Sequence, residues 1–200
     1  MELFSNIKDR YEDIVFARRE PVVAPLKQEH FELCDENLAW KAHSRVKESL
    51  EAAKGSYNSK VHRLTQPWRM IYTLVTLDME VNNGGFHQFF TNAGGRYDSH
   101  IQQDVQFLDH SQLSRLFKSV WTEYAGIDYN DQWDNRGKSW SYFTQPYKEG
   151  RWEKETMIYY REVISCDSIM PILGRFIRSN PSAYTHSIDP RTEDAPSNGG

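Results

Sequence analysis

The segment over residues 66–82 constrains the fold more than any other part of the chain. Thr65 is a residue type that caps the amino end of a helix, and Pro67 is tolerated in a first helical turn. The apolar residues of the segment are Trp68, Met70, Ile71, Leu74, Val75, Leu77 and Val81. On a helix they would cover most of the circumference, and such a helix is typical of a protein interior. We therefore predict a buried helix at the centre of the domain.

Apolar residues recur at helical spacing in four further segments, which we predict to be helices. These are residues 35–54, 98–108, 111–125 and 168–180. No series of alternating β-branched runs occurs, so a large sheet is not expected. Because 200 residues suit one domain of ordinary size, the predicted fold is all-α, with a single compact helical domain.

The helical domain is expected to span residues 35–181. Residues 1–34 contain Pro21 and Pro25 and are predicted to form an irregular amino-terminal arm. Residues 182–200 are rich in Ser, Pro, Asp and Gly without periodicity, which predicts a disordered tail. Around residues 123–160, aromatic side chains stand among Gly, Ser, Asn and Pro, so we also expect an irregular aromatic-rich insertion.

Composition and charge argue against several classes of protein. The chain has 24 basic and 28 acidic residues, a balance too mild for a protein that binds nucleic acid by neutralising phosphates. Cys34 and Cys166 are too few for a disulfide framework and form no CxxC pair. No run approaches the roughly 18 apolar residues of a spanning helix, and no signal-peptide pattern opens the chain. We expect a cytoplasmic protein that binds neither nucleic acid directly nor a membrane.

The segment that follows the predicted central helix is the most unusual of the chain. Gly84-Gly85 and Gly94-Gly95 bracket a short, very aromatic stretch. Asn83 and Gly84 are residue types that reach the left-handed conformation that ends a helix, so we predict a sharp corner between two helices. No lysine or GxGxxG pattern follows, which argues against a phosphate-binding loop.

Glu80 is oddly placed just before this corner, because a carboxylate near a helix carboxyl end opposes the helix dipole. Its position is reasonable if it accepts hydrogen bonds from the exposed amides of the following helix, capped by Asn82 or Asn83. The spacing of Phe86, Phe89 and Phe90 predicts an aromatic face directed inward.

The corner carries a resemblance to a known family. The residues concerned are Glu80, Asn82, Asn83, Gly84, Gly85, Phe86, Gln88, Phe90 and Asn92. Their order and spacing resemble the signature of the bacterial DNA-mimic protein family, and the resemblance extends over residues 65–182. It implies an all-helical domain without known catalytic activity, and it points to a homodimer. In this sequence we expect the nine signature residues to have a structural role.

The resemblance also implies a function. Members of that family bind DNA-binding proteins, such as a histone-like nucleoid protein or a repressor, by presenting carboxylates where DNA presents phosphates. DNA carries one charge per about 1.7 Å of axis, so a mimic needs a dense acidic face. The near balance of charges in this chain departs from that requirement.

The best candidate for an acidic face lies between Glu123 and Asp167, where nine acidic residues accompany six basic ones. The predicted partner-binding residues are Asp128, Asp131, Asp134, Trp133, Trp140, Glu149 and Glu153. Tyr and Trp in a segment of mixed charge are typical of protein interfaces. Two alternatives stay open: a solvated surface with ordinary charge pairs, and an ordered insertion that covers the core.

These observations favour a non-enzymatic domain that binds another protein, in its sharper form a DNA mimic that occludes the basic surface of a DNA-binding protein. The alternative is an immunity protein that neutralises a bacterial toxin. An enzyme is a third hypothesis, without a catalytic motif in its support. His100 and Asp104, one helical turn apart, are the nearest approach to a metal site, and we predict neither a metal nor a cofactor.

Overall fold

The computed structural model describes residues 21–55, 57–90, 92, 100–125, 149–164 and 169–186. Helices dominate this part of the chain, and none of its residues belongs to a β-strand. The all-α prediction is therefore confirmed. No helix among these residues combines the length and the apolarity that crossing a bilayer requires.

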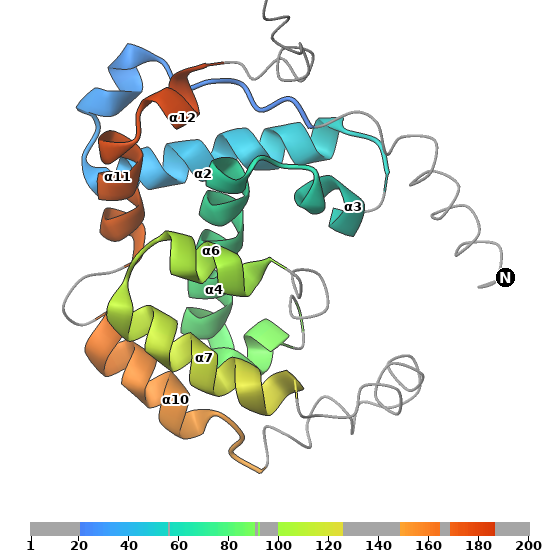
Figure 1. The fold of residues 1–200 in the computed structure, drawn as a ribbon, viewed down its shortest axis with the longest axis vertical. Helices are drawn as coiled ribbons and strands as arrows, with labels where there is room; N and C mark the ends of the chain where they lie inside the picture. Colours follow the sequence, from blue (N-terminus) through green and yellow to red (C-terminus); the bar gives the residue numbers. More distant parts are fainter. Residues whose placement is uncertain are drawn as a thin grey trace, which may run out of the picture.

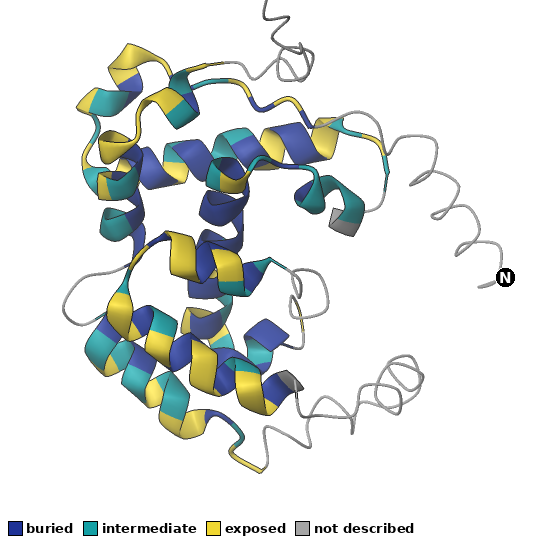
Figure 2. Cartoon of the chain, viewed as in Figure 1, coloured by how far each residue is buried: buried dark blue, intermediate teal, exposed yellow. Residues whose placement is uncertain are grey.

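Helix α4 (Gln66–Phe89) runs through the middle of the described structure (Figure 1). Most of its residues are buried, as the dark blue turns in Figure 2 show, whereas Met79, Asn82 and Asn83 are exposed. The buried residues of its first part are Trp68, Arg69, Met70, Ile71, Tyr72, Thr73, Leu74, Val75, Leu77, Asp78 and Val81. The prediction of a central buried helix is confirmed, although the helix continues past residue 82 through a kink at Gly84 and Gly85.

Helices α2 (Asp35–Ala52) and α11 (Ile169–Ser179) pack against each other and against α4. Their close approach depends on Gly174, because a Cβ there would lie 2.0 Å from the carbonyl oxygen of Asp35. Arg178 Nε donates to the Asp35 carboxylate at 2.7 Å, which ties the end of α11 to the start of α2.

Helix α6 (Ile101–Phe107) packs on α4, and α7 (Ser111–Ala125) packs on α6. The predicted helices at 35–54, 98–108, 111–125 and 168–180 correspond to α2, α6, α7 and α11, and they are confirmed within a few residues. Local periodicity was enough to find them because each buries one continuous apolar stripe.

Two helical segments lie where an irregular insertion was expected. Helix α10 (Glu153–Ile158) continues into a π-helical turn, η3 (Tyr159–Val163), and both pack on α7. The expectation of irregular structure is wrong for this stretch, because a short helix with few buried positions gives almost no periodic signal. Residues 126–148, the rest of the expected insertion, lie outside the described residues.

The ends of the described chain also differ from expectation. The expected arm includes a short 3₁₀ helix, η1 (Gln28–Glu32), and the expected tail begins with α12 (Ser182–Thr185). Tyr184 of α12 is fully buried, and its carbonyl accepts a hydrogen bond from the Leu26 N–H at 2.8 Å. Packing between these two segments orders residues that have little helical signal of their own. A further short helix that was not expected, α3 (Tyr57–His62), follows α2.

One buried histidine couples the fold to pH. The ring of His43 on α2 stacks on Tyr72 of α4 at 5.3 Å and meets the edge of Trp40 at 5.7 Å. Burial, followed by the positive charge of Lys47, lowers the pKa of His43 from 6.5 to about 4. The folded state therefore binds this proton less readily than the unfolded chain does.

We predict that His43→Phe, which keeps an aromatic ring but cannot titrate, removes part of the acid sensitivity. A depressed folded-state pKa gives stability that is present above pH 6.5 and is lost as the pH falls towards 4. The stability of the wild type relative to His43→Phe should therefore fall by about 3 kcal/mol over that window. Urea unfolding at pH 7, 5.5 and 4 measures it; parallel curves for the two proteins would contradict the prediction.

Candidate functional site at the signature corner

The kink in α4 is built on two glycines with different conformations. Gly84 has φ −163° and ψ 25°, whereas Gly85 has φ 76° and ψ −177°. The left-handed helical conformation expected at Asn83 or Gly84 is not observed at Gly84; the positive φ occurs instead at Gly85, with an extended ψ, in a region where glycine is strongly favoured. A Cβ on Gly85 would also lie 2.9 Å from Thr156 Oγ1 of α10, so the backbone and the neighbouring helix both require this glycine.

Helix α10 and the π-helical turn η3 that continues it supply the hydrogen bonds that the kink needs. The Phe86 N–H donates to Thr156 Oγ1 at 3.2 Å, and the Tyr160 O–H donates to the carbonyl of Val81 at 2.6 Å. The polar groups next to the break are therefore paired with residues from another helix. The expected capping by Asn82 or Asn83 does not satisfy the Phe86 amide, because Thr156 does.

Glu80 joins the two sides of the corner through side chains. Its Oε2 accepts hydrogen bonds from Gln88 Nε2 at 2.8 Å and from Asn92 Nδ2 at 2.9 Å. The expected partners were backbone amides, and the observed ones are side-chain amides of two other signature residues. One carboxylate oxygen thus explains why Glu, Gln and Asn occur at these spacings.

The phenylalanines of the corner face the core, as predicted. Phe86, Phe89 and Phe90 are all buried. The ring of Phe90 stacks on Tyr124 of α7 at 3.9 Å and lies 4.7 Å from the ring of Trp152, just before α10. The corner therefore directs its aromatic side chains between α7 and the start of α10.

A buried carboxylate that sequence analysis missed lies one turn before the corner. Asp78 Oδ1 accepts a hydrogen bond of 2.5 Å from the Tyr159 hydroxyl, in the π-helical turn η3. Burial raises the pKa of Asp78, while hydrogen bonds from Tyr159 and the signature residue Asn82 oppose that shift. An aspartate in an otherwise apolar helix indicates a buried polar contact, but its partner could not be predicted because Tyr159 is distant in the sequence.

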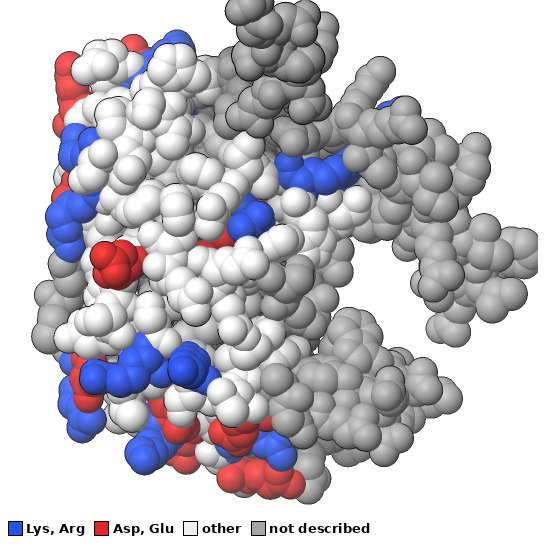
Figure 3. Space-filling model, in the orientation of Figure 1, with Lys and Arg blue, Asp and Glu red and all other residues white. Residues whose placement is uncertain are grey.

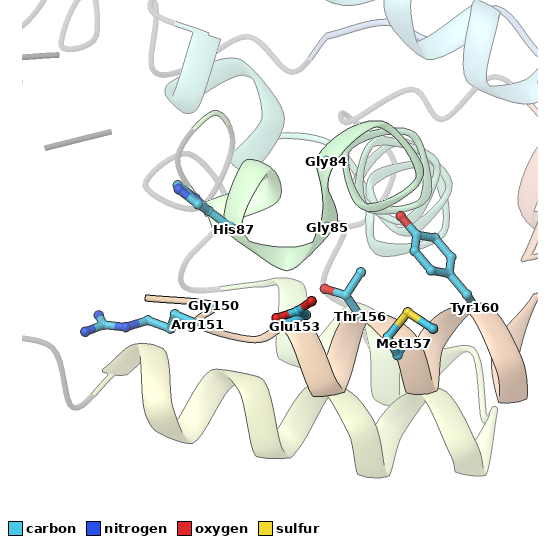
Figure 4. Close-up of a pocket in the computed structure, with 9 residues that line it drawn as sticks. All are labelled: Gly84, Gly85, His87, Gly150, Arg151, Glu153, Thr156, Met157 and Tyr160. Atoms are coloured by element: carbon cyan, nitrogen blue, oxygen red, sulfur yellow. The ribbon is translucent and has the colours of Figure 1, made fainter. Parts of the chain in front are cut away.

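A pocket of about 330 Å³ opens between the corner and α10 (Figure 4). Its lining residues are Gly84, Gly85, His87, Gly150, Arg151, Glu153, Thr156, Met157 and Tyr160. Arg151 forms an ion pair with Glu149 at 3.5 Å. Burial, together with the positive charge of Arg151, lowers the pKa of His87, which favours a neutral ring at pH 7.

The structure places only part of the predicted partner-binding set. Glu149 and Glu153 lie close to this pocket, the former paired with Arg151 and the latter in the lining. The other predicted residues, Asp128, Asp131, Trp133, Asp134 and Trp140, lie outside the described residues.

The charges of the described residues balance. Acidic and basic side chains occur there in equal number, so the net charge of −4 arises from the remaining residues. Figure 3 shows Lys and Arg over α7, with Asp and Glu among them towards the edge where α10 begins. The face drawn there has mixed charge over both helices.

His100 and Asp104, the pair closest to a metal-site pattern in the sequence, contact other side chains. Arg69 and Thr73 of α4 bond to both carboxylate oxygens of the fully buried Asp104, at 2.9 to 3.2 Å. The ring of His100 lies 4.7 Å from that of His62. Among the residues placed by the structure, no cluster of three or more His, Cys, Asp or Glu side chains could hold a metal ion.

Comparison with known proteins identifies the family. A family model described as DMP19-like protein matches residues 62–180, from the end of α3 to the end of α11. This chain belongs to the DMP19-like protein family. The matched range of the DMP19-like chain contains the whole signature and the partners of the corner in α10. No curated protein and no solved structure matches the chain.

We predict that Gly85→Ala destabilises this DMP19-like chain by about 1–3 kcal/mol, since alanine is strained at φ 76°. Gly84→Ala should cost less. Its extended φ suits any residue, so the cost should come only from the new Cβ, which would lie 2.2 Å from Gln88 Oε1 and displace the Gln88 amide from Glu80. Thermal unfolding of both variants tests the order, and an unchanged melting temperature for Gly85→Ala would contradict the assigned conformation.

We further predict that Glu80→Ala costs about 1–2 kcal/mol, because the amides of Gln88 and Asn92 both lose their acceptor. Glu80→Gln should cost less, since its amide oxygen still accepts. Glu123→Ala, at an exposed position of α7, serves as the control and should change stability by less than about 0.5 kcal/mol. Equal urea midpoints for all three variants would show that the hydrogen bonds of Glu80 with Gln88 and Asn92 do not stabilise the fold.

Proposed function

We propose that this chain is a non-enzymatic protein-binding domain that acts as a DNA mimic and occludes the basic surface of a DNA-binding protein. Membership of the DMP19-like family is the observation that carries the proposal. The action is proposed for the cytoplasm. A homodimer is part of the same proposal, and sedimentation of the purified protein would test it.

The charge distribution indicates which part of the chain would imitate DNA. Because charges balance over the described residues, their surface as a whole does not imitate a phosphate backbone. The acidic segment between Glu123 and Asp167 is the part of the chain best suited to this role. We propose that Asp128, Asp131 and Asp134 supply the carboxylates, together with Glu149 and Glu153 farther along the same segment.

An immunity protein that neutralises a bacterial toxin is the second candidate. The observation in its favour is the aromatic content of the same segment, with Trp133 and Trp140 as proposed anchors. Buried Trp side chains dominate the binding energy of many interfaces, and such complexes depend little on salt. The two candidates therefore predict different responses to ionic strength.

The test uses a partner that is captured from the native cytosol and then purified. For a DNA mimic, the complex should weaken steeply with salt, and duplex DNA should displace the chain. Changing Asp128, Asp131 and Asp134 to Asn should weaken the complex at least about tenfold without changing stability, because exposed charges contribute little to folding.

A triple variant with the same change in charge provides the control. Glu29, Glu48 and Glu51 are exposed residues of η1 and α2, and their replacement by Gln should leave the complex intact. A complex that survives high salt, ignores DNA and fails in Trp133→Ala or Trp140→Ala would support the immunity protein instead. Tolerance of every change would show that the binding surface lies elsewhere.

A further inference from the structure

The pocket at the corner contains one carboxylate that no described cation neutralises. Glu153 lines the pocket, and within the described structure its side chain takes part in no ion pair or hydrogen bond. Its Oε2 lies 3.1 Å from where a Cβ of Gly150 would be, so the absent side chain leaves room for the carboxylate. Figure 4 shows Glu153 in the middle of the lining residues, next to Thr156.

The two basic side chains of the lining are directed elsewhere. The guanidinium of Arg151 is paired with Glu149 at 3.5 Å and lies 5.8 Å from the centre of the Trp152 ring. In Figure 4, Arg151 and the ring of His87 both point away from Glu153. The lowered pKa of His87 favours its neutral form, so the negative charge of Glu153 dominates the middle of the pocket.

The walls around Glu153 suit the stem of a long side chain. Met157 is 60% exposed, and the ring of the half-buried Tyr160 lies beside it. Thioether and aromatic groups pack well against the methylene groups of Arg and Lys, and an aromatic face attracts their charge. On the opposite wall, the signature residues Gly84 and Gly85 present no side chain.

We propose that this pocket binds a basic side chain, Arg or Lys, of the partner protein, with Glu153 as its counter-charge. The inference rests on the proposed function, in which the partner presents a basic surface. The volume of about 330 Å³ lies at the small end of ligand sites, which run from about 300 to 1,000 Å³, and it suits one side chain. The signature glycines thus keep a binding site open as well as shaping the corner.

The experiment is an NMR titration of the ¹⁵N-labelled full chain with N-acetyl-arginine methylamide. The amide signals of Gly84, Gly85 and Gly150 report on the pocket, and they should shift saturably. N-acetyl-citrulline methylamide, which has the same shape without the charge, should leave these signals in place. N-acetyl-lysine methylamide in a parallel titration shows which basic side chain is preferred.

Two matched variants decide the role of the carboxylate. Glu153→Gln should weaken binding of the arginine probe at least about tenfold, the effect of losing a charge-assisted hydrogen bond. Glu155→Gln, on the same helix but outside the lining, should bind as the wild type does. Absence of saturable shifts at the glycines, or equal binding by Glu153→Gln and wild type, would overturn the proposal.

This titration needs no partner, so its outcome is separable from that of the DNA competition. If the probe binds but DNA does not displace the chain from its partner, the DNA-mimic proposal is refuted and the pocket proposal stands. If DNA displaces the chain but the probe does not bind, the pocket proposal is refuted and the DNA-mimic proposal stands.

Discussion

The positive φ of Gly85 breaks α4, the longest described helix, close to its buried carboxyl end. Such a break leaves backbone groups that need partners, and Thr156 of α10 and Tyr160 of η3 provide them. The same change of direction turns Phe89 and Phe90 towards α7. Helix α10 can therefore pack on α4 only where the break presents these groups, and the pocket follows from that packing. The position of Gly85 sets the arrangement of this whole side of the molecule.

Two buried carboxylates also set the positions of the elements that pack on α4, because each needs a polar partner. Asp104 of α6 is satisfied by Arg69 and Thr73, and Asp78 is satisfied by Tyr159. A buried ion pair adds little net stability, but leaving one partner alone costs several kcal/mol. Alternative packings that separate these groups are therefore penalised. Each pair selects one relative position of α4 and its neighbour, whereas the apolar contacts supply most of the stability.

The signature residues both hold the corner together and border the pocket. Glu80, Gln88 and Asn92 hold the corner, while Gly84 and Gly85 also line the pocket beside Glu153. In the proposed mimic, a patch of carboxylates would attract a basic partner at long range, and the pocket would take up one of its side chains at contact. Electrostatic attraction sets the rate of encounter more than the final affinity, so a site for one specific side chain adds selectivity that a mildly acidic surface lacks.

The sequence alone determined the all-α class, the central helix, four of its neighbours, the inward face of Phe86, Phe89 and Phe90, and the resemblance to the family. All of these follow from spacing within one segment. The tertiary structure decided the rest. The partners of the corner, Thr156, Tyr159 and Tyr160, lie 70 to 81 residues from the groups they bind, and no local pattern encodes such a distance. Two consecutive tyrosines in a π-helical turn also have no α-helical period. The helices could be predicted from the sequence because helix formation depends on neighbouring residues. The pocket could not, because it depends on where two helices that are distant in the sequence meet.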